Sequence, residues 1–225
     1  MGAGQAVSLT LGQTHYVQNV MRRGIGDTIF LFNGIDGEWF AEIAALGKRN
    51  GIAACKSQSR PQIKQGDLWL LFAPIKKART DYIVEKATEM GCSRLQPVIT
   101  QFTNADRTKL DRMTAQAIEA AEQSERLTIP AVCTPIALRK IMENWPAERV
   151  LIFADENAPS NMTSIPEGPA GILIGPEGGF SDEERDYLKQ VTNCHPISLG
   201  SRILRAETAA VAALVLYQST VGDWV

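Results

Sequence analysis

Apolar and polar positions follow two different patterns along the chain. In the first 70 residues, short segments such as 28–32 and 38–43 alternate between apolar and polar side chains, and Asn-Gly and Asp-Gly dipeptides separate them. Alternation with a period of two, broken by these dipeptides, is typical of β-hairpins. We therefore predict a small β domain over residues 1–70 and a second domain over residues 71–225.

Short apolar runs without strict alternation recur from residue 68 onwards, with helical patterns between them. Such runs are typical of strands that are buried on both faces of a sheet. Because strands that alternate with helices favour a mostly parallel sheet, we predict an α/β fold for this part. The predicted strands are residues 68–73, 95–99, 150–154, 171–174 and 197–199.

Three segments carry apolar residues at the spacing of an α-helix. The first runs from about Asp81 and stops at Gly91, a residue suited to a left-handed helix cap. The second spans about Thr108 to Ser124. A polar stripe, typical of a solvated face, follows one side of it: Arg112, Gln116, Glu119, Gln123 and Arg126. The third, about Glu207 to Gln218, is apolar nearly all round and needs cover on every side, so we expect it in a dimer interface.

Composition narrows the classes of protein to which the chain can belong. Hydrophobic residues make up 44% and charged residues 21% of the 225 residues, which is ordinary for a folded globular protein. The four cysteines lie far apart and only two histidines accompany them, so we expect neither a disulfide framework nor a metal site.

No apolar run approaches the roughly 20 residues of a membrane span and the start lacks a signal peptide, so we expect a cytoplasmic protein without membrane contact. The formal net charge of −2 gives no global attraction to a polyanion, so binding to nucleic acid would need a local basic patch.

The sharpest local signal is a glycine-rich turn between a buried strand and a helix start, in the sequence LIGPEGGFSDEE from Leu173 to Glu184. Ser181 and Glu184 have the spacing of a helix capping box. Three glycines within five residues allow a ligand to approach the backbone, although a purely structural turn fits the same residues. The pattern matches neither GxGxxG nor GxxxxGKS/T, which argues against a dinucleotide or a nucleoside triphosphate as ligand.

A second segment of the same design follows, with the sequence SLGSRILRAETAA from Ser198 to Ala210. It places two arginines, a glutamate and a threonine between the end of a strand and the start of a helix. Ligands of open α/β sheets collect at this position. A structural alternative is that Arg202 and Arg205 pair with Glu207 or with another carboxylate nearby.

Together these two segments resemble the last two motifs of the ribosomal RNA small-subunit methyltransferase E family (RsmE), a member of the SPOUT superfamily. The resemblance continues upstream through KATEMG, QPVIT and EAAEQSER, and it covers most of residues 68–218. The chain departs from the family pattern at Gln101 and Phe102, where the family commonly has an arginine, and it lacks the arginine-aromatic pair with which the family usually begins. We expect these departures to affect RNA contacts.

The resemblance implies a small PUA-like β-barrel followed by a SPOUT α/β domain whose C-terminal part forms a trefoil knot. It also implies S-adenosyl-L-methionine as cofactor, N3 of a uridine in 16S ribosomal RNA as target, an assembled 30S small-subunit particle as partner, and a homodimer. Two alternatives stay open: a SPOUT methyltransferase that acts on another RNA position, and a non-catalytic RNA-binding or ribosome-assembly protein.

The resemblance also suggests which residues form the site. Ten residues of the two segments are expected to hold the cofactor: Leu173, Gly175, Pro176, Gly178, Gly179, Leu199, Gly200, Ile203, Leu204 and Thr208. Six residues are expected to contact RNA: His15, Arg22, Arg23, Lys76, Gln123 and Arg126. Removal of the N3 proton leaves negative charge on the uracil ring, which a preorganised cation would stabilise. Arg205, with Arg202 second, is the candidate for this role, while Glu177 or Glu207 is the candidate general base or a group that orients an arginine.

Overall fold

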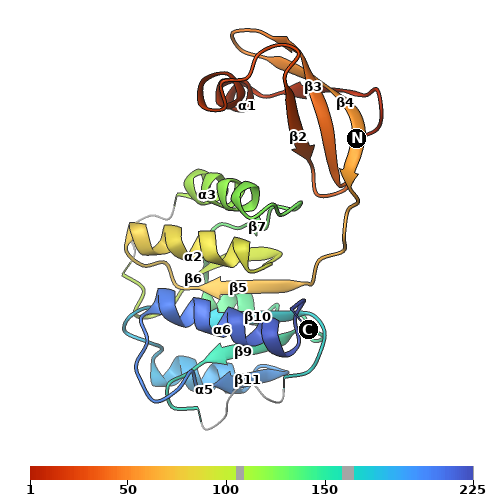
Figure 1. Ribbon diagram of the computed structural model, residues 1–225. Coiled ribbons are helices and arrows are strands. Elements are labelled where there is room, and N and C mark those ends of the chain that lie inside the picture. The colour runs from red at the N-terminus through yellow and green to blue at the C-terminus, as the bar shows by residue number, and fades with distance from the viewer. Residues whose placement is uncertain (105–108, 159–164, 225) are drawn as a thin grey trace. The chain divides into compact units, whose positions relative to one another are not determined.

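The computed structural model divides the chain into two compact units, residues 1–64 and 65–225 (Figure 1). The residues that the structure describes are 1–104, 109–158 and 165–224. The boundary lies before strand β5 (Leu68–Phe72), which a division at residue 70 would cut. The whole strand belongs to the second unit because it pairs with two other strands of that unit.

The first unit is a four-stranded antiparallel sheet with the strand order β1-β4-β3-β2. Its strands are β1 (Ala6–Leu9), β2 (Thr28–Phe32), β3 (Glu38–Leu46) and β4 (Gly51–Arg60). The two predicted alternating segments are therefore confirmed as β2 and the first part of β3. Between these strands, the side chain of Asn33 accepts hydrogen bonds from the N–H groups of Ile35 and Asp36, which stabilises the turn.

Two short helical segments follow β1, and the strand pattern did not predict them. They are helix α1 (Leu11–His15) and the π-helical turn η1 (Tyr16–Val20). Thr10 and Gln13 form a capping box at the start of α1. The first unit has a core of its own, which consists of Leu9, Val17, Ile29, Ala41, Ile43 and Ala53.

The second unit is built on a sheet of seven strands, in which the described pairings are all parallel. These strands are β5, β6 (Arg94–Ile99), β7 (Ala131–Val132), β8 (Ile136–Ala137), β9 (Val150–Ala154), β10 (Ala170–Ile174) and β11 (Cys194–Ile197). The strand order is β11-β9-β10-β5-β6-β7, with β8 also paired to β6. The predicted parallel α/β fold is confirmed. The last predicted strand is shifted: β11 ends at Ile197, because the Ser198 hydroxyl accepts a hydrogen bond from the Gly200 N–H and turns the chain.

Helices cover both faces of this sheet. They are α2 (Lys77–Glu89), α3 (Leu110–Gln123), α4 (Leu138–Met142), α5 (Asp182–Lys189) and α6 (Ala206–Thr220). One apolar cluster joins α2, α3 and α6 to one face, and a second cluster joins α4 and α5 to the other. Neighbouring residues of β5 show this division, since Leu70 belongs to the first cluster and Leu71 to the second.

The three predicted helices exist, with shifted ends. Helix α2 begins at Lys77 rather than at Asp81, because polar residues without an apolar repeat form its first turn. Gly91 follows the helix with a φ of 82°, which confirms the predicted left-handed cap. Helix α3 begins at Leu110, and its predicted start at Thr108 lies outside the described residues. Among the helices that the structure describes, none is long and apolar enough to cross a membrane.

Strand β10 lies between β9 and β5, and both of these strands precede it in the sequence. Because the strands are parallel, the loops after β5, β9, β10 and β11 leave the sheet at the same edge. The two segments singled out in the sequence follow β10 and β11, so they meet at this edge. The trefoil knot that the resemblance implies stays a prediction.

Candidate active site

The glycine-rich turn connects β10 to α5. Ser181 caps this helix: its hydroxyl accepts a hydrogen bond from the Glu184 N–H, and the Glu184 carboxylate accepts one from the Ser181 N–H at 3.1 Å. The predicted capping box is therefore confirmed. Within the turn, the Gly179 N–H donates to the Pro176 carbonyl at 2.9 Å. Gly179 has a φ of 68°, which glycine adopts without strain.

The other two glycines of the turn leave room for aromatic rings of the protein itself. A Cβ atom on Gly175 would lie 2.7 Å from the Phe180 ring, and one on Gly178 would lie 3.1 Å from Cβ of Phe102. The structural alternative therefore accounts for the glycines at these two positions, whereas Gly179 is required by its backbone conformation. Contact between the backbone of this turn and a cofactor stays a prediction.

Arg185 on α5 fixes the turn to the end of the neighbouring strand β9. Its Nε donates to the Phe180 carbonyl at 3.1 Å, and its guanidinium forms ion pairs with Asp155 and, at 2.9 Å, with Glu156. Asp155 is buried, with only 4% of its surface exposed, and a buried carboxylate needs such a partner. The sequence motifs did not single out these groups, because the contacts join segments that are far apart in the chain.

Arg79, in the first turn of α2, connects the glycine-rich turn to the start of α6. Its Nη1 lies 3.3 Å from Glu177 Oε1, and its Nε lies 3.4 Å from Glu207 Oε1. Within the described part of the chain, Arg202 and Arg205 form no ion pair, and both are exposed. The alternative in which Arg202 or Arg205 pairs with Glu207 is therefore wrong, because Arg79 is its partner. The sequence analysis did not single out Arg79, although its position shortly after a predicted strand, at the edge where ligands of such sheets bind, is a weak signal.

The loop between β11 and α6 is mostly exposed. Gly200 has a φ of 105°, and among the described residues other than its two chain neighbours no atom lies within 4 Å of the position that a Cβ atom on it would take. Leu199 packs against the core and Leu204 is half-buried, whereas Ile203 is 89% exposed. Three more predicted site residues of this segment are exposed: Arg202, Arg205 and Thr208. The two guanidinium groups are thus accessible to a polyanion.

The predicted cofactor residues come together at the edge of the sheet where β10 and β11 end, and Arg79 contacts both the turn after β10 and the start of α6. Leu173 differs from the rest: its side chain is fully buried in the core on the α5 side, so only its backbone can reach a ligand. Pro176 is buried as well. In the described ranges, no group of three or more His, Cys, Asp or Glu side chains could hold a metal ion.

The predicted RNA contacts are distributed over both units. His15 at the end of α1, with Arg22 and Arg23 after η1, is exposed on the first unit. Lys76 and Gln123 are exposed on the second unit, at the start of α2 and the end of α3. These five residues are accessible, and their contact with RNA stays a prediction.

Arg126 departs from this set because it is buried. Glu125 has a φ of 55°, and the turn directs Arg126 inwards, away from the polar stripe of α3. Its Nη1 donates to the Thr88 carbonyl at 2.6 Å, its Nη2 donates to the Cys92 carbonyl at 2.6 Å, and both its Nε and its Nη2 donate to Gln65 Oε1. Burial also lowers the pKa of this guanidinium. Because these donors already serve the end of α2, we interpret Arg126 as a structural residue, and its contact with RNA stays a prediction.

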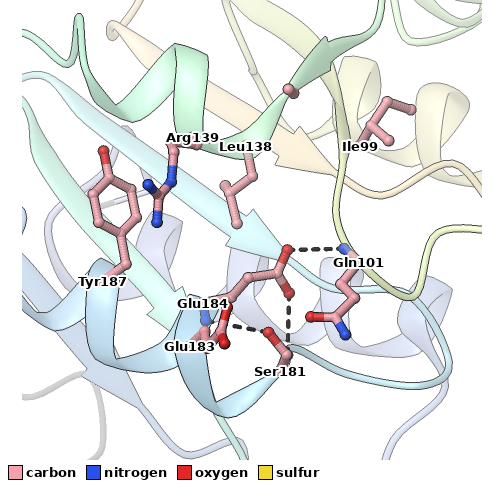
Figure 2. A pocket seen from close by; sticks show the side chains of 9 residues that line it. Ile99, Gln101, Leu138, Arg139, Ser181, Glu183, Glu184 and Tyr187 are labelled. Carbon is pink, nitrogen blue, oxygen red and sulfur yellow. Dashed lines mark hydrogen bonds between the residues drawn. The ribbon is translucent and has the colours of Figure 1, made fainter.

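A pocket of about 330 Å³ opens beside the glycine-rich turn, between the end of β6 and the helices α4 and α5 (Figure 2). Its walls are formed by Ile99, Gln101, Ala137, Leu138, Arg139, Ser181, Glu183, Glu184 and Tyr187. Figure 2 shows the Glu184 carboxylate between Ser181 and Gln101, whose N–H donates to it at 2.8 Å. The guanidinium of Arg139 lies 5.0 Å from the centre of the Tyr187 ring. The sequence could not reveal this pocket, because its walls come from three separate segments.

The departure from the family pattern at Gln101 and Phe102 falls beside this turn. The N–H of Gln101 binds the carboxylate that caps α5, and Phe102 lies against Gly178. These two residues therefore support the turn after β10. An effect of this departure on RNA contacts stays a prediction.

Two family models match the chain. One, described as an RNA methyltransferase domain, matches residues 62–218, and the other, described as an RNA methyltransferase PUA domain, matches residues 9–53. The ribosomal RNA small subunit methyltransferase E of Rickettsia conorii is 35% identical over 206 residues, which cover 89% of this chain and 84% of the relative. The protein of the same name from Synechocystis sp. is 33% identical over 219 residues, which cover 92% of this chain and 71% of the relative.

A solved structure is similar over the whole chain. It is the crystal structure of a ribosomal RNA small subunit methyltransferase E from Neisseria gonorrhoeae bound to S-adenosyl methionine. The TM-score is 0.91 at 28% sequence identity, and the match covers 100% of this chain and 96% of that chain. The resemblance that the two motifs indicated is thus confirmed over both units: this chain belongs to the ribosomal RNA small subunit methyltransferase E family.

Proposed function

We propose that this protein transfers a methyl group from S-adenosyl-L-methionine to N3 of a uridine in 16S ribosomal RNA. The observation that carries the proposal is the similarity, over both units, to proteins named ribosomal RNA small subunit methyltransferase E. The Neisseria relative was crystallised with S-adenosyl methionine, which supports the same cofactor here. The match of residues 9–53 to a PUA domain of RNA methyltransferases supports RNA as the substrate.

The residues at the edge of the sheet fit this cofactor. Glu207 Oε2 is buried and has no hydrogen-bond partner among the described residues. S-adenosylmethionine carries an ammonium group, ribose hydroxyls and an adenine amine, each of which can donate to such an oxygen. The space around Gly200 leaves its backbone accessible. We therefore assign cofactor binding to the backbone of residues 173–179 and 199–204; when bound, the cofactor supplies a methyl group activated by its sulfonium.

The chain's own side chains then have to position the uracil and stabilise the charge that develops on it. Arg205 precedes α6 at the cofactor loop and is exposed, so we assign this stabilisation to it, with Arg202 as the second choice. Of the two carboxylates, Glu177 has 47% of its side chain exposed, against 15% for Glu207. Glu177 is therefore the better candidate for the general base, since an RNA base can reach it.

Exposed basic groups on both units hold the RNA in this proposal. Phosphate contacts from His15, Arg22 and Arg23 would position the substrate without reading its sequence, and Lys76 and Gln123 would add contacts from the second unit. We further propose an assembled 30S particle in the cytoplasm as the substrate, and a reaction that needs no metal ion.

We also propose that the protein acts as a homodimer in which a second copy covers one face of α6. Ala210 and Leu214 are buried in the core, whereas Val211 and Val215 are only half-buried and Leu216 is 39% exposed. An apolar helix face of this kind is buried when two copies pair about a twofold axis.

Methylation of purified 30S particles from cells that lack the gene tests the proposal, with labelled cofactor and mass-spectrometric mapping of the modified nucleoside. We expect 3-methyluridine, and we expect Arg205→Ala to slow the single-turnover rate by roughly a hundred- to a thousandfold with little change in cofactor affinity. Arg205→Lys keeps the charge but not the planar fork, so it should recover only part of the rate. A folded Arg205→Ala protein with nearly full activity would refute the role of Arg205. Methylation at another position would refute the target, and absence of cofactor binding by the unaltered protein would refute the reaction.

A further inference from the structure

We infer that Arg79 is a positioning residue that holds the two cofactor segments of the site against each other through Glu177 and Glu207. The inference rests on the proposed function, because it concerns the same site. It names a group that lies outside both sequence motifs. Arg79 belongs to α2, which follows β5, whereas the two glutamates follow β10 and β11.

The geometry of the contact shows why one arginine can serve both segments. Glu177 lies 3.3 Å from Nη1 of Arg79, and Glu207 lies 3.4 Å from its Nε. Different nitrogens of the planar guanidinium thus face carboxylates from different segments. Lysine carries a single nitrogen and could not present two fixed donors in this way. The side chain of Arg79 is 32% exposed, so the bridge is partly shielded from solvent.

Apolar packing joins α6 to β10, whereas separate polar contacts hold the glycine-rich turn and the loop before α6. Arg185 fixes the turn to the end of β9, and the hydroxyl of Ser198 binds the N–H of Gly200 at the start of the loop. Neither of these contacts joins the turn to α6. The bridge through Arg79 adds this polar link, and it therefore fixes the backbone groups that the proposed function assigns to the cofactor more closely than the apolar packing alone.

The bridge also orients the Glu207 carboxylate. Its Oε1 faces Arg79, while its Oε2 is buried without a hydrogen-bond partner among the described residues. A carboxylate that is anchored through one oxygen presents the other in a fixed direction, and a fixed acceptor loses little entropy when a donor of the cofactor binds it. Arg79 acts on the cofactor through Glu207 in this arrangement.

Three variants separate this role from a general effect on stability: Arg79→Ala, Arg79→Lys and the matched control Arg112→Ala. The control removes another arginine that pairs with α2, since Arg112 binds Asp81. That pair joins α2 to α3 and touches neither cofactor segment. Hydrogen exchange without cofactor is measured on peptides that cover residues 175–180 and 198–207. We expect faster exchange in both peptides for Arg79→Ala, an intermediate effect for Arg79→Lys, and unchanged exchange for Arg112→Ala.

Calorimetry with S-adenosylmethionine gives the second readout. We expect Arg79→Ala to weaken binding roughly tenfold or more, because the loops lose their relative position. If Arg79 acts through Glu207, then Glu207→Gln should weaken binding as well, and combining it with Arg79→Ala should add little to either single change.

Additive losses, or unchanged exchange in both peptides, would overturn the inference. If the unaltered protein binds no cofactor, the proposed function fails, while the exchange experiment still decides whether Arg79 couples the two segments. Should Arg79→Ala not fold, Arg79→Lys and Glu207→Gln decide the question in the same assays.

Discussion

Replacing Arg126 by methionine tests whether this arginine is structural. Methionine is unbranched and apolar like the stem of arginine but has no donors, so the change removes the hydrogen bonds to the carbonyls of Thr88 and Cys92 and to the side chains of Gln65 and Thr128. The Thr88 carbonyl keeps a second donor, the Gly91 N–H at 3.1 Å. The larger cost is expected at the Cys92 carbonyl, because this buried acceptor loses the hydrogen bond that Arg126 donates to it.

The expected loss can be worked out from these contacts. Hydrogen bonds from a charged donor contribute about 1.5–3 kcal/mol each, and a buried carbonyl left without a partner costs about 1–3 kcal/mol. Relief from keeping a guanidinium buried offsets part of this loss. We therefore expect Arg126→Met to lower the free energy of unfolding by about 2–4 kcal/mol, a large part of the roughly 5–15 kcal/mol that stabilises a typical domain. The free energy of unfolding of Arg126→Lys should lie between those of the unaltered protein and Arg126→Met, because lysine keeps the charge but cannot reach all of these acceptors.

Urea unfolding followed by tryptophan fluorescence measures this loss, since Trp69, Trp145 and Trp224 all lie in the second unit. The matched control is Arg112→Met, which breaks an ion pair whose arginine is 43% exposed and should cost less than about 1 kcal/mol. RNA binding is measured in parallel. If Arg126→Met loses no more stability than the control but binds RNA much more weakly, Arg126 contacts RNA and its assignment as a structural residue is refuted.

Two further predictions concern the cofactor and the oligomeric state. Gly179 has a φ of 68°, so Gly179→Val should distort the turn and abolish binding of S-adenosylmethionine in a protein whose circular dichroism is unchanged; equal affinity in calorimetry would speak against this turn as the cofactor site. The half-exposed apolar face of α6 predicts a dimer in light scattering at micromolar concentration, which Leu216→Glu should dissociate; a mass of 24.6 kDa for the unaltered protein would exclude the dimer.

Local features of the chain could be predicted from the sequence because neighbouring residues determine them. The buried strands β5, β9 and β10 stand out as short apolar runs, and Gly91 and Ser181 mark helix ends by their own chemistry. The last strand was misplaced because Ile197 and Leu199 are apolar residues on either side of Ser198, although a hydrogen bond from the Gly200 N–H to Ser198 already turns the chain. The apolar pattern of a sequence therefore does not show at which residue the pairing of a strand ends.

Contacts between distant segments could not be predicted in the same way. Arg79 carries no motif, and its importance depends on two carboxylates that reach it from other loops. Arg126 continues the spacing of a polar helix face, but the positive φ of Glu125 breaks that spacing and turns the side chain inwards. An arginine on an exposed helix face and one that binds buried carbonyls therefore have the same sequence pattern, and only the contacts distinguish them.

The position of β10 has a consequence for the order in which the sheet is completed during synthesis. Ribosomes release the chain from its N-terminus, so β5 emerges long before β10, the strand that lies between β5 and β9, and β9 emerges shortly before it. Until residues 170–174 arrive, these two strands have no central partner, and pairs such as Leu71 with Leu173 join residues that are far apart in the chain. Sheets built from such distant pairs fold slowly. Both predicted cofactor segments follow β10, so we expect the nascent protein to bind its ligand only after β10 has paired with β5 and β9.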